Sequence, residues 1–451
     1  MEVNGVKYVS SAGAPITIKL DAVKEYDVSG DLIGHIEIIS STEPVGPTKL
    51  RLKGVNILSD ADSGIVYSPE KKKLVVEIYA NTSNYISIPN GKEKDDAAAI
   101  LSNSDVTITG TGFLALSTNL GHAIKASELV VNGEPKMSID AVHDAFHASK
   151  ILRITGGEFI IESCNDVLSA GSAEDPSKIT VEMTITGGKF IINGSTDAIF
   201  QNKSTVGNCR IIKGDFEFAS DKINEMFQEE DGGTKVSVYD LCTFTGLSEA
   251  QQAEVDSRKL ILADQYGECK VTYRDADGAV FELEALGDTY SLDKGSSMAY
   301  TISGNITGKT FVTADKKVDI NLAGVYCNEE DESGTILFDY QNTSSRLEVN
   351  CTEGYITYIK KNSGIIFHSN SNISLKLKES DATETVPQKV AVGYFSAPNG
   401  AVINAYCESM SEPSRSAIAG DGICYVTDSN IGVYANCLWL GNEHADEGEA
   451  K

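Results

Sequence analysis

A repeat between residues 104 and 203 constrains the fold more than any other feature of the chain. Each copy is a short run of β-branched residues that ends at one or two glycines, as in Asp105–Gly110, Lys150–Gly157 and Val181–Gly188. The runs are too short for helices, and the glycines mark turns at which the backbone takes a positive φ. The pattern therefore predicts short strands joined by tight turns.

A second feature keeps the same period. An Asp or His residue precedes a small and an apolar residue at four positions, which are His122, Asp144, Asp166 and Asp197. The first two spacings are equal and the third is longer, and we interpret Glu174–Ser177 as a loop inserted into the long step. A period in the low twenties is typical of coils stacked into a solenoid, so we predict a parallel β-helix.

Whole segments of the chain also repeat. Tyr26–Gly34 resembles Tyr300–Gly308, and Leu52–Val55 resembles Leu322–Val325, with nearly the same offset in both cases. We therefore predict an all-β chain with two tandem parallel β-helices. The predicted domains are a first β-helix with an N-terminal cap, a helical or irregular connector, and a diverged second β-helix with a frayed acidic C-terminus; they span residues 1–245, 246–279 and 280–451.

Helix signals are confined to the region between the two copies. Ser248–Gln251 forms a capping box, and good helix formers continue to Gln265 before Gly267. Asp221–Gln228 is compatible with one or two further helical turns. Because the open end of a solenoid exposes strand edges and apolar core, we expect this segment to cover such an end, and the alternative is a helix that binds a partner.

Charge excludes two classes of partner. The 451 residues carry 65 acidic and 38 basic side chains, for a net charge of −27. This charge repels phosphate backbones and anionic bilayers, so we expect neither nucleic-acid binding nor membrane insertion. The N-terminus has no basic, apolar export signal, so either such a segment has been removed or the protein does not use the secretory route.

The nine cysteines are odd in number and contain no Cys-X-X-Cys pair, which argues against a zinc site and a full disulfide framework. Most replace a small apolar residue in a strand-like run, so we expect buried free thiols. This usage indicates folding under reducing conditions.

Residues 50–202 resemble bacterial carbohydrate-binding-domain proteins built as right-handed parallel β-helices, which share a shape with pectate lyases. The matching motifs are Ile154–Gly157 with Asn165–Leu168, Ile185–Gly188 with Thr196–Ile199, and His143–Phe146. The resemblance implies right-handed coils and an extracellular, non-catalytic protein that binds acidic or plant-type polysaccharide, often with calcium. The family's paired Asp-Asp is reduced here to one Asp.

The aspartate column allows two interpretations. Asp144, Asp166 and Asp197 would stack on successive coils, and their mutual repulsion would favour a cation such as calcium. Alternatively, each Asp accepts backbone N–H groups at its own turn. His122 interrupts the acidic column at one end. His143 and His147 are four residues apart, a spacing that gives no single metal-binding face on strands and turns.

Candidate sugar-binding residues are aromatic, namely Tyr67, Tyr79, Tyr85 and the single tryptophan, Trp439. The alternative is that the tyrosines pack at coil corners. A polysaccharide lyase would need a base such as Lys150, Arg153, Lys178 or Lys189, but nothing in their spacing distinguishes one of them.

We therefore expect no enzymatic activity and predict a secreted or cell-surface protein that binds polysaccharide or adheres to a surface. The alternative is a structural part of a phage virion or other appendage, folded in the host cytoplasm and contacting a capsid protein. A lyase is less favoured, and the oligomeric state stays open.

Overall fold

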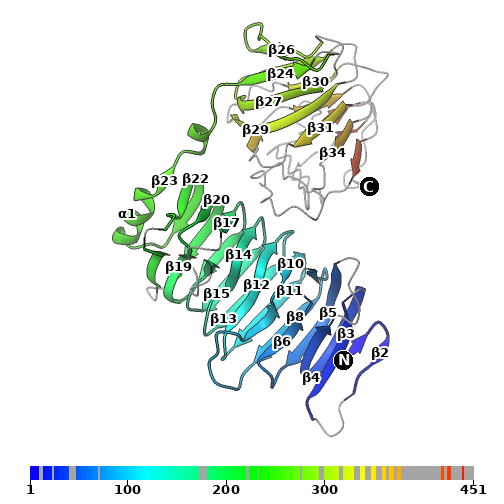
Figure 1. The fold of residues 1–451 in the computed structure, drawn as a ribbon, viewed down its shortest axis with the longest axis vertical. Coiled ribbons are helices and arrows are strands. Elements are labelled where there is room, and N and C mark those ends of the chain that lie inside the picture. Colours follow the sequence, from blue (N-terminus) through cyan, green and yellow to red (C-terminus); the bar gives the residue numbers. More distant parts are fainter. Residues whose placement is uncertain are drawn as a thin grey trace. The chain divides into compact units, whose positions relative to one another are not determined.

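The structure is a computed structural model that divides into two units, Met1–Leu260 and Ile261–Lys451, which are treated separately below. The prediction of an all-β chain is confirmed, because strands dominate both units (Figure 1). The predicted connector 246–279 is divided between the two units. The described residues are 1–9, 14–22, 25–39, 47–69, 72–171, 180–219, 223–231, 233–274, 277–293, 299–313, 318–329 and, beyond these, the strands given below as far as Leu440.

Strands of the first unit are stacked in three parallel columns, and the chain visits each column once per coil. Column A starts in the first part of β4 (Glu25–Ile39) and runs through β5 (Thr48–Leu58), β7 (Lys73–Ile78), β10 (Asp105–Gly110), β12 (His122–Val131), β14 (Phe146–Ile154), β17 (Val181–Ile185), β20 (Gly207–Phe218) and β22 (Ser237–Thr245).

Column B lies next along each coil and again pairs in parallel. It starts in the middle of β4, continues in the second half of β5 and ends in the second halves of β20 and β22. Between them it runs through β8 (Ser83–Ile88), β11 (Phe113–Thr118), β13 (Lys136–Ala141), β15 (Glu158–Ser163) and β18 (Lys189–Ile192).

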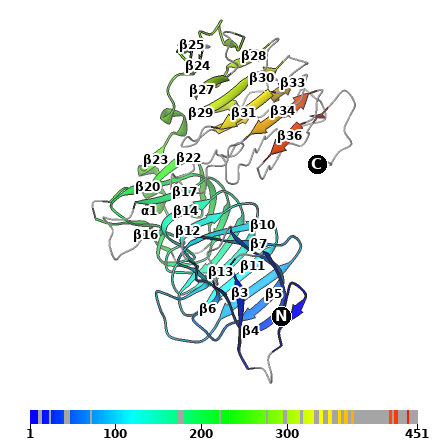
Figure 2. The same cartoon turned by 45° about the vertical axis from the view of Figure 1, so that its right-hand side comes forward.

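Column C completes the coil and uses the first halves of β12 and β14. Its other members are β3 (Ile16–Asp21), β4 (Glu25–Ile39), β6 (Ser63–Tyr67), β9 (Ala98–Ser102), β16 (Leu168–Gly171), β19 (Ser195–Lys203) and β21 (Ile223–Glu229). The short strands β1 (Glu2–Val3) and β2 (Val6–Lys7) form a hairpin that pairs antiparallel with β4. Figure 2 shows the strands of this unit following one another in chain order.

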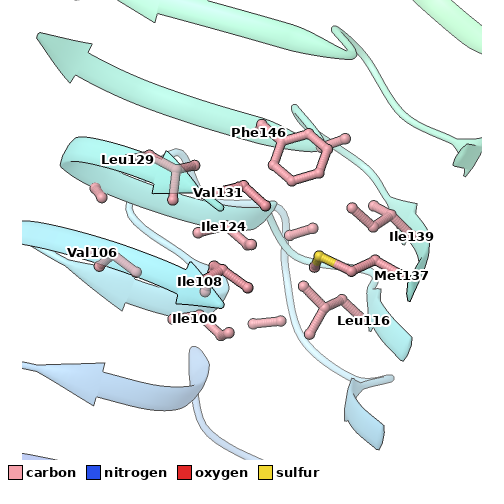
Figure 3. Packing of buried hydrophobic residues seen from close by; sticks show 14 of the residues in the cluster. Ile100, Val106, Ile108, Leu116, Ile124, Leu129, Val131, Met137, Ile139 and Phe146 are labelled. Carbon is pink, nitrogen blue, oxygen red and sulfur yellow. The ribbon is translucent and has the colours of Figure 1, made fainter. Parts of the chain in front are cut away.

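Alternation of apolar and polar residues explains why these segments form half-buried strands. In β7, for example, Leu74, Val76 and Ile78 are fully buried while the residues between them are half-buried. Buried side chains from all three columns form one core, as Figure 3 shows for Ile100 of column C and Leu116 of column B.

A ladder of phenylalanines crosses the later coils of this core. Phe159, Phe190, Phe216 and Phe244 are in direct register, and their neighbouring ring centroids lie 4.7, 4.8 and 5.1 Å apart in stacked geometry. Stacked rings at this separation add to the free energy gained by burying apolar area.

The end of the first unit shows where local sequence signals succeed and fail. Helix α1 (Glu249–Ser257) begins at Ser248 with both bonds of the predicted capping box, but it ends at Ser257 rather than Gln265. Residues Leu262–Gln265 form a separate 3₁₀ turn, after the short strand β23 (Lys259–Leu260).

The prediction of helix at Asp221–Gln228 is wrong from Ile223 onward, because strand β21 begins there, and residues 221–222 lie outside the described residues. This strand pairs with β19 and buries Ile223, Met226 and Phe227, so tertiary pairing overrides local helix propensity. Val255 of α1 belongs to the same core, and Gln251 Nε2 donates to the Ile223 carbonyl at 3.4 Å.

The second unit contains two further series of strands that are mostly parallel. One series is β25 (Val280–Glu282), β24 (Lys270–Arg274), β27 (Ala299–Asn305), β29 (Asp319–Glu329), β31 (Leu347–Cys351), β34 (Ile373–Lys376) and β36 (Cys424–Thr427), with β32 (Tyr358–Lys361) beside β29. The other is β26 (Thr289–Ser291), β28 (Thr310–Thr313), β30 (Ile336–Tyr340), β33 (Ile365–Ser369), β35 (Ile418–Gly420) and β37 (Trp439–Leu440).

Two general features concern the described residues. None of their helices is long and apolar enough to cross a membrane. Cys164, Cys209, Cys242 and Cys327 are buried free thiols, and Cys269 is a half-buried one. The predicted loop at Glu174–Ser177 lies outside the described residues.

We expect Phe190→Ala to lower the free energy of unfolding of the first unit by about 3–5 kcal/mol, because it opens a cavity between two stacked rings. Urea denaturation followed by circular dichroism measures the change. The control is Tyr85→Ala, which removes an exposed ring and should cost less than about 1 kcal/mol. Equal effects of the two substitutions would contradict the core position of Phe190.

Burial raises the pKa of the Cys209 and Cys242 thiols to about 12. We therefore expect neither to react with a thiol reagent at about pH 8 in the native protein, while both react in denaturant. Peptide mapping by mass spectrometry after brief alkylation distinguishes these positions from the other cysteines. Rapid native labelling of either one would show that its coil opens readily.

Candidate functional site

The Asp and His residues that recur with the period of the sequence repeat lie at the start of column C. His122 is the first residue of β12, while Asp144 and Asp166 precede β14 and β16. The register pairs Ile124 with Phe146 and Phe146 with Leu168, and the offset in the numbering is the same each time. His122, Asp144 and Asp166 therefore occupy equivalent positions on three successive coils.

Two histidines and a lysine surround the Asp144 carboxylate, which is only 1% exposed. Asp144 Oδ2 lies 2.7 Å from His147 Nδ1, 3.4 Å from His122 Nδ1 and 3.8 Å from Lys203 Nζ. Burial opposes ionisation of Asp144, but the contacts with His122 and His147 and the charge of Lys203 hold its pKa well below the usual range.

Asp166 differs from Asp144 in its partners. Its Oδ1 accepts the Ala198 N–H at 2.9 Å, and this group belongs to the neighbouring coil and not, as the turn-capping alternative predicted, to the residue's own turn. Its Oδ2 is buried and has no hydrogen-bond partner among the described residues. Burial and the neighbouring Asp144 carboxylate raise the pKa of Asp166 to about 8.

Asp197 does not continue the column. The register of β16 with β19 pairs Leu168 with Phe200, so Ala198, and not Asp197, takes the position above Asp166. A shift of one residue turns a strand side chain to the other face. Asp197 is half-exposed, and its Oδ1 accepts a hydrogen bond from Gln228 Nε2 at 3.0 Å.

A third histidine packs against this cluster. The His143 ring lies 5.1 Å from the His122 ring in edge-to-face geometry. Its Nε2 is 2.9 Å from Glu93 Oε1, and its Nδ1 is 3.4 Å from Asp95 Oδ1. Since both acids are well exposed, His143 connects the buried cluster to the surface.

The four predicted aromatic binding residues differ in exposure. Tyr67 is 1% exposed and part of the core, so its interpretation as a surface platform is wrong. Tyr79 is 44% and Tyr85 47% exposed. Trp439 lies in β37, and its side chain is outside the described residues.

Tyr85 stands on an outward row of column B. Phe113 contacts it edge-to-face, with the ring centroids 6.1 Å apart. Asn56 is in register with Tyr85, and the exposed Leu58 follows two residues later on the same strand. We refer to Asn56, Leu58, Tyr85, Ser87 and Phe113 as the Tyr85 face.

Comparison with known proteins identifies the family. The model of a family described as carbohydrate-binding domain-containing proteins matches residues 12–268, which is more than half of the chain. The chain belongs to this family. The predicted resemblance is thereby confirmed, and the matched residues include both the His122–Asp144–His147 cluster and the Tyr85 face.

Solved and curated proteins add little to this assignment. A solved polysaccharide lyase-like protein from C. thermocellum, described as a gadolinium derivative, is similar at 19% identity over 53% of this chain and 92% of that chain, with a TM-score of 0.33. No curated protein matches.

Two of the four candidate lyase bases, Arg153 and Lys189, lie close to acidic side chains. The Arg153 guanidinium lies against Glu182, with Nε 3.1 Å from Oε1 and Nη2 3.4 Å from Oε2. Lys189 Nζ is 3.8 Å from Glu217 Oε2. Lys150 is exposed, and Lys178 lies outside the described residues.

Sequence reasoning missed the grouping of His122 and His147 around Asp144. The regular spacing of the repeat already placed His122 directly beside Asp144 on the neighbouring coil. His147 follows Asp144 closely in the chain, and the turn before β14 brings its ring back to the carboxylate. Searching across coils, rather than along one strand, would have found the cluster.

Proposed function

We propose that this carbohydrate-binding-family protein binds polysaccharide without altering it chemically, and that the Tyr85 face is the binding surface of its first unit. The observation that carries the proposal is the exposed Tyr85 ring, which stands beside Phe113 on a regular strand column. An aromatic ring with a hydroxyl group suits a sugar, because it offers an apolar face and a polar edge.

The backbone beneath Tyr85 is held across three strands. Asn84 is fully buried, and its Oδ1 accepts the N–H groups of Gly54 and Val55 at 2.9 Å each. Its Nδ2 donates to the Phe113 carbonyl at 3.0 Å. A ring carried by so constrained a strand loses little conformational entropy when a ligand binds.

Polar groups suited to sugar hydroxyls accompany the rings. Asn56 Nδ2 donates to Asp31 Oδ1 at 2.9 Å on the next strand, which fixes the orientation of the amide. Ser87 and Ser117 are paired in register beside Tyr85. Rings with neutral hydrogen-bonding groups around them support recognition of a sugar.

A neighbouring position offers positive charge. Lys53 Nζ lies 4.6 Å from the centre of the Tyr79 ring and 2.7 Å from Asp27 Oδ2. We propose that this pair interacts with the charged groups of an acidic glycan. Because the whole chain carries −27, cations such as calcium would assist the approach of such a polymer.

We infer further that the three columns form a right-handed parallel β-helix and that the second unit arose by duplication. The duplication is supported by an irregularity that both units share. The pairing of β4 with β5 shifts register between Val28 and Gly30, and the pairing of β27 with β29 shifts register between Ile302 and Gly304. The glycines of both bulges have positive φ: Gly30, Gly54, Gly304 and Gly324. A polysaccharide ligand also favours an extracellular location.

Tyr85→Ala should weaken binding to polysaccharide by about 30-fold, since truncating a central aromatic anchor typically costs about 2 kcal/mol. The measurement is co-sedimentation and affinity electrophoresis with a panel of neutral and acidic polysaccharides, including polygalacturonate with calcium. Val206→Ala, which trims an exposed apolar side chain elsewhere in the unit, is the control. Unchanged binding by the Tyr85 variant would place the sugar elsewhere.

The proposal that the protein does not cleave the polysaccharide it binds has a separate test. Incubation with polygalacturonate and calcium should yield no unsaturated product above the uncatalysed rate, measured by ultraviolet absorbance. Steady product formation that Arg153→Gln or Lys150→Gln abolishes would mean that the protein is a lyase. This assay does not depend on the location of the binding face.

A further inference from the structure

The cluster at the start of column C contains metal-binding donor atoms. One ligand atom each from His122, Asp144 and His147 lies within 4.8 Å of the other two, and all three residues are buried. Their elements are neighbouring strands of a regular stack, so the backbone fixes the three side chains relative to one another.

A second observation points to the same place. Asp166 occupies the slot above Asp144, is 0% exposed, and has one carboxyl oxygen without a hydrogen-bond partner among the described residues. A buried oxygen of this kind costs free energy unless something binds it. A cation beside Asp144 would provide that partner.

The charged groups of the site are compatible with a divalent ion. Two buried carboxyl groups face each other here, and the cationic side chain described nearest to them is Lys203, whose Nζ is 3.8 Å from Asp144 Oδ2 and which is about a quarter exposed. A divalent cation bound by the two neutral imidazoles and Asp144 would stabilise negative charge on both carboxyl groups, with Lys203 at the edge of the site.

The donor types decide which ion fits. Calcium prefers six to eight oxygen ligands, whereas this cluster offers two imidazole nitrogens, and Asp197 points elsewhere. The residues therefore do not fit calcium, and calcium binding at Asp144, Asp166 and Asp197 stays an untested prediction. Two histidines with carboxylates suit Zn²⁺ and related transition metals.

The distances are compatible with such an ion after a small adjustment. Ligands about 2.0–2.1 Å from Zn²⁺ in a tetrahedron lie roughly 3.3 Å from one another. His122 Nδ1 is 3.4 Å from Asp144 Oδ2 and accepts the Asp144 N–H at 3.3 Å, a bond that the metal would replace, while His147 Nδ1 is at 2.7 Å. The metal would take the place of the proton in the His147–Asp144 hydrogen bond and move these two atoms slightly apart.

We propose that His122, Asp144 and His147 bind one transition-metal ion, best matched by Zn²⁺, which joins neighbouring coils of the first unit, with the buried Asp166 carboxyl on the next coil beside the site. His143, held by Glu93, packs on His122 and orients its ring from outside the site. Because His122, Asp144, His147 and the neighbouring Asp166 are all buried, the role is structural, and it is independent of the proposed sugar binding.

The full-length protein tests this after dialysis against a chelator and then against metal-free buffer. Zn²⁺ alone should bind with a stoichiometry of one in calorimetry and raise the thermal midpoint of the first unit. Co²⁺ alone should give visible absorption bands of a tetrahedral site with nitrogen ligands, a signature that surface binding to carboxylates does not produce. Ca²⁺ alone should do neither.

His122→Gln and His147→Gln should each weaken Zn²⁺ binding by more than about 100-fold and abolish the Co²⁺ bands. His35→Gln, a histidine on β4 away from the cluster, is the matched control and should change nothing. Far-UV circular dichroism verifies that each variant is folded. If Zn²⁺ and Co²⁺ do not bind the wild type, or bind both cluster variants normally, the proposal is wrong whether or not the protein binds sugar.

Discussion

In-register stacking of parallel strands is the constraint on which the rest of the first unit depends. Each side chain lies about 4.8 Å from the equivalent side chains on the neighbouring coils. The side chains of one row must therefore be able to pack against one another. Aromatic rings satisfy this condition by stacking, as Phe190 does between Phe159 and Phe216. Charged rows satisfy it by alternation, as with Lys136 and Glu158 at 3.2 Å.

The same constraint explains what the sequence could predict. A constant offset between coils correctly placed His122, Asp144 and Asp166 on adjacent coils. The sequence does not give the exact offset across the insertion. Asp197 was therefore assigned to the row of Asp144 and Asp166, whereas the register gives that position to Ala198. Tyr67 was misjudged because exposure depends on which face of the strand meets the core, and β6 buries this residue.

Buried polar groups in such a stack need partners on the adjacent coils, since water does not reach them. Asn84 finds three such partners in the backbone of its neighbours and fixes the strand that carries Tyr85. Asp144 finds two imidazoles. Among the described residues, Asp166 finds a single N–H group for its two oxygens. The cluster around Asp144 and Asp166 therefore differs from the rest of the core in that one of its buried oxygens has no hydrogen-bond partner among the described residues.

The Tyr85 face has consequences for how strongly a polymer can be held. Its exposed and half-exposed rings, Tyr85 and Phe113, lie on adjacent coils, while Ala115 and Ser138 continue the Tyr85 row along column B. This row therefore offers one anchor and not a periodic series. A single aromatic anchor gives modest affinity, so tight binding to a polysaccharide would require a second contact. The duplication proposed above would supply it on the same chain, because linkage converts the second binding event into an intramolecular one.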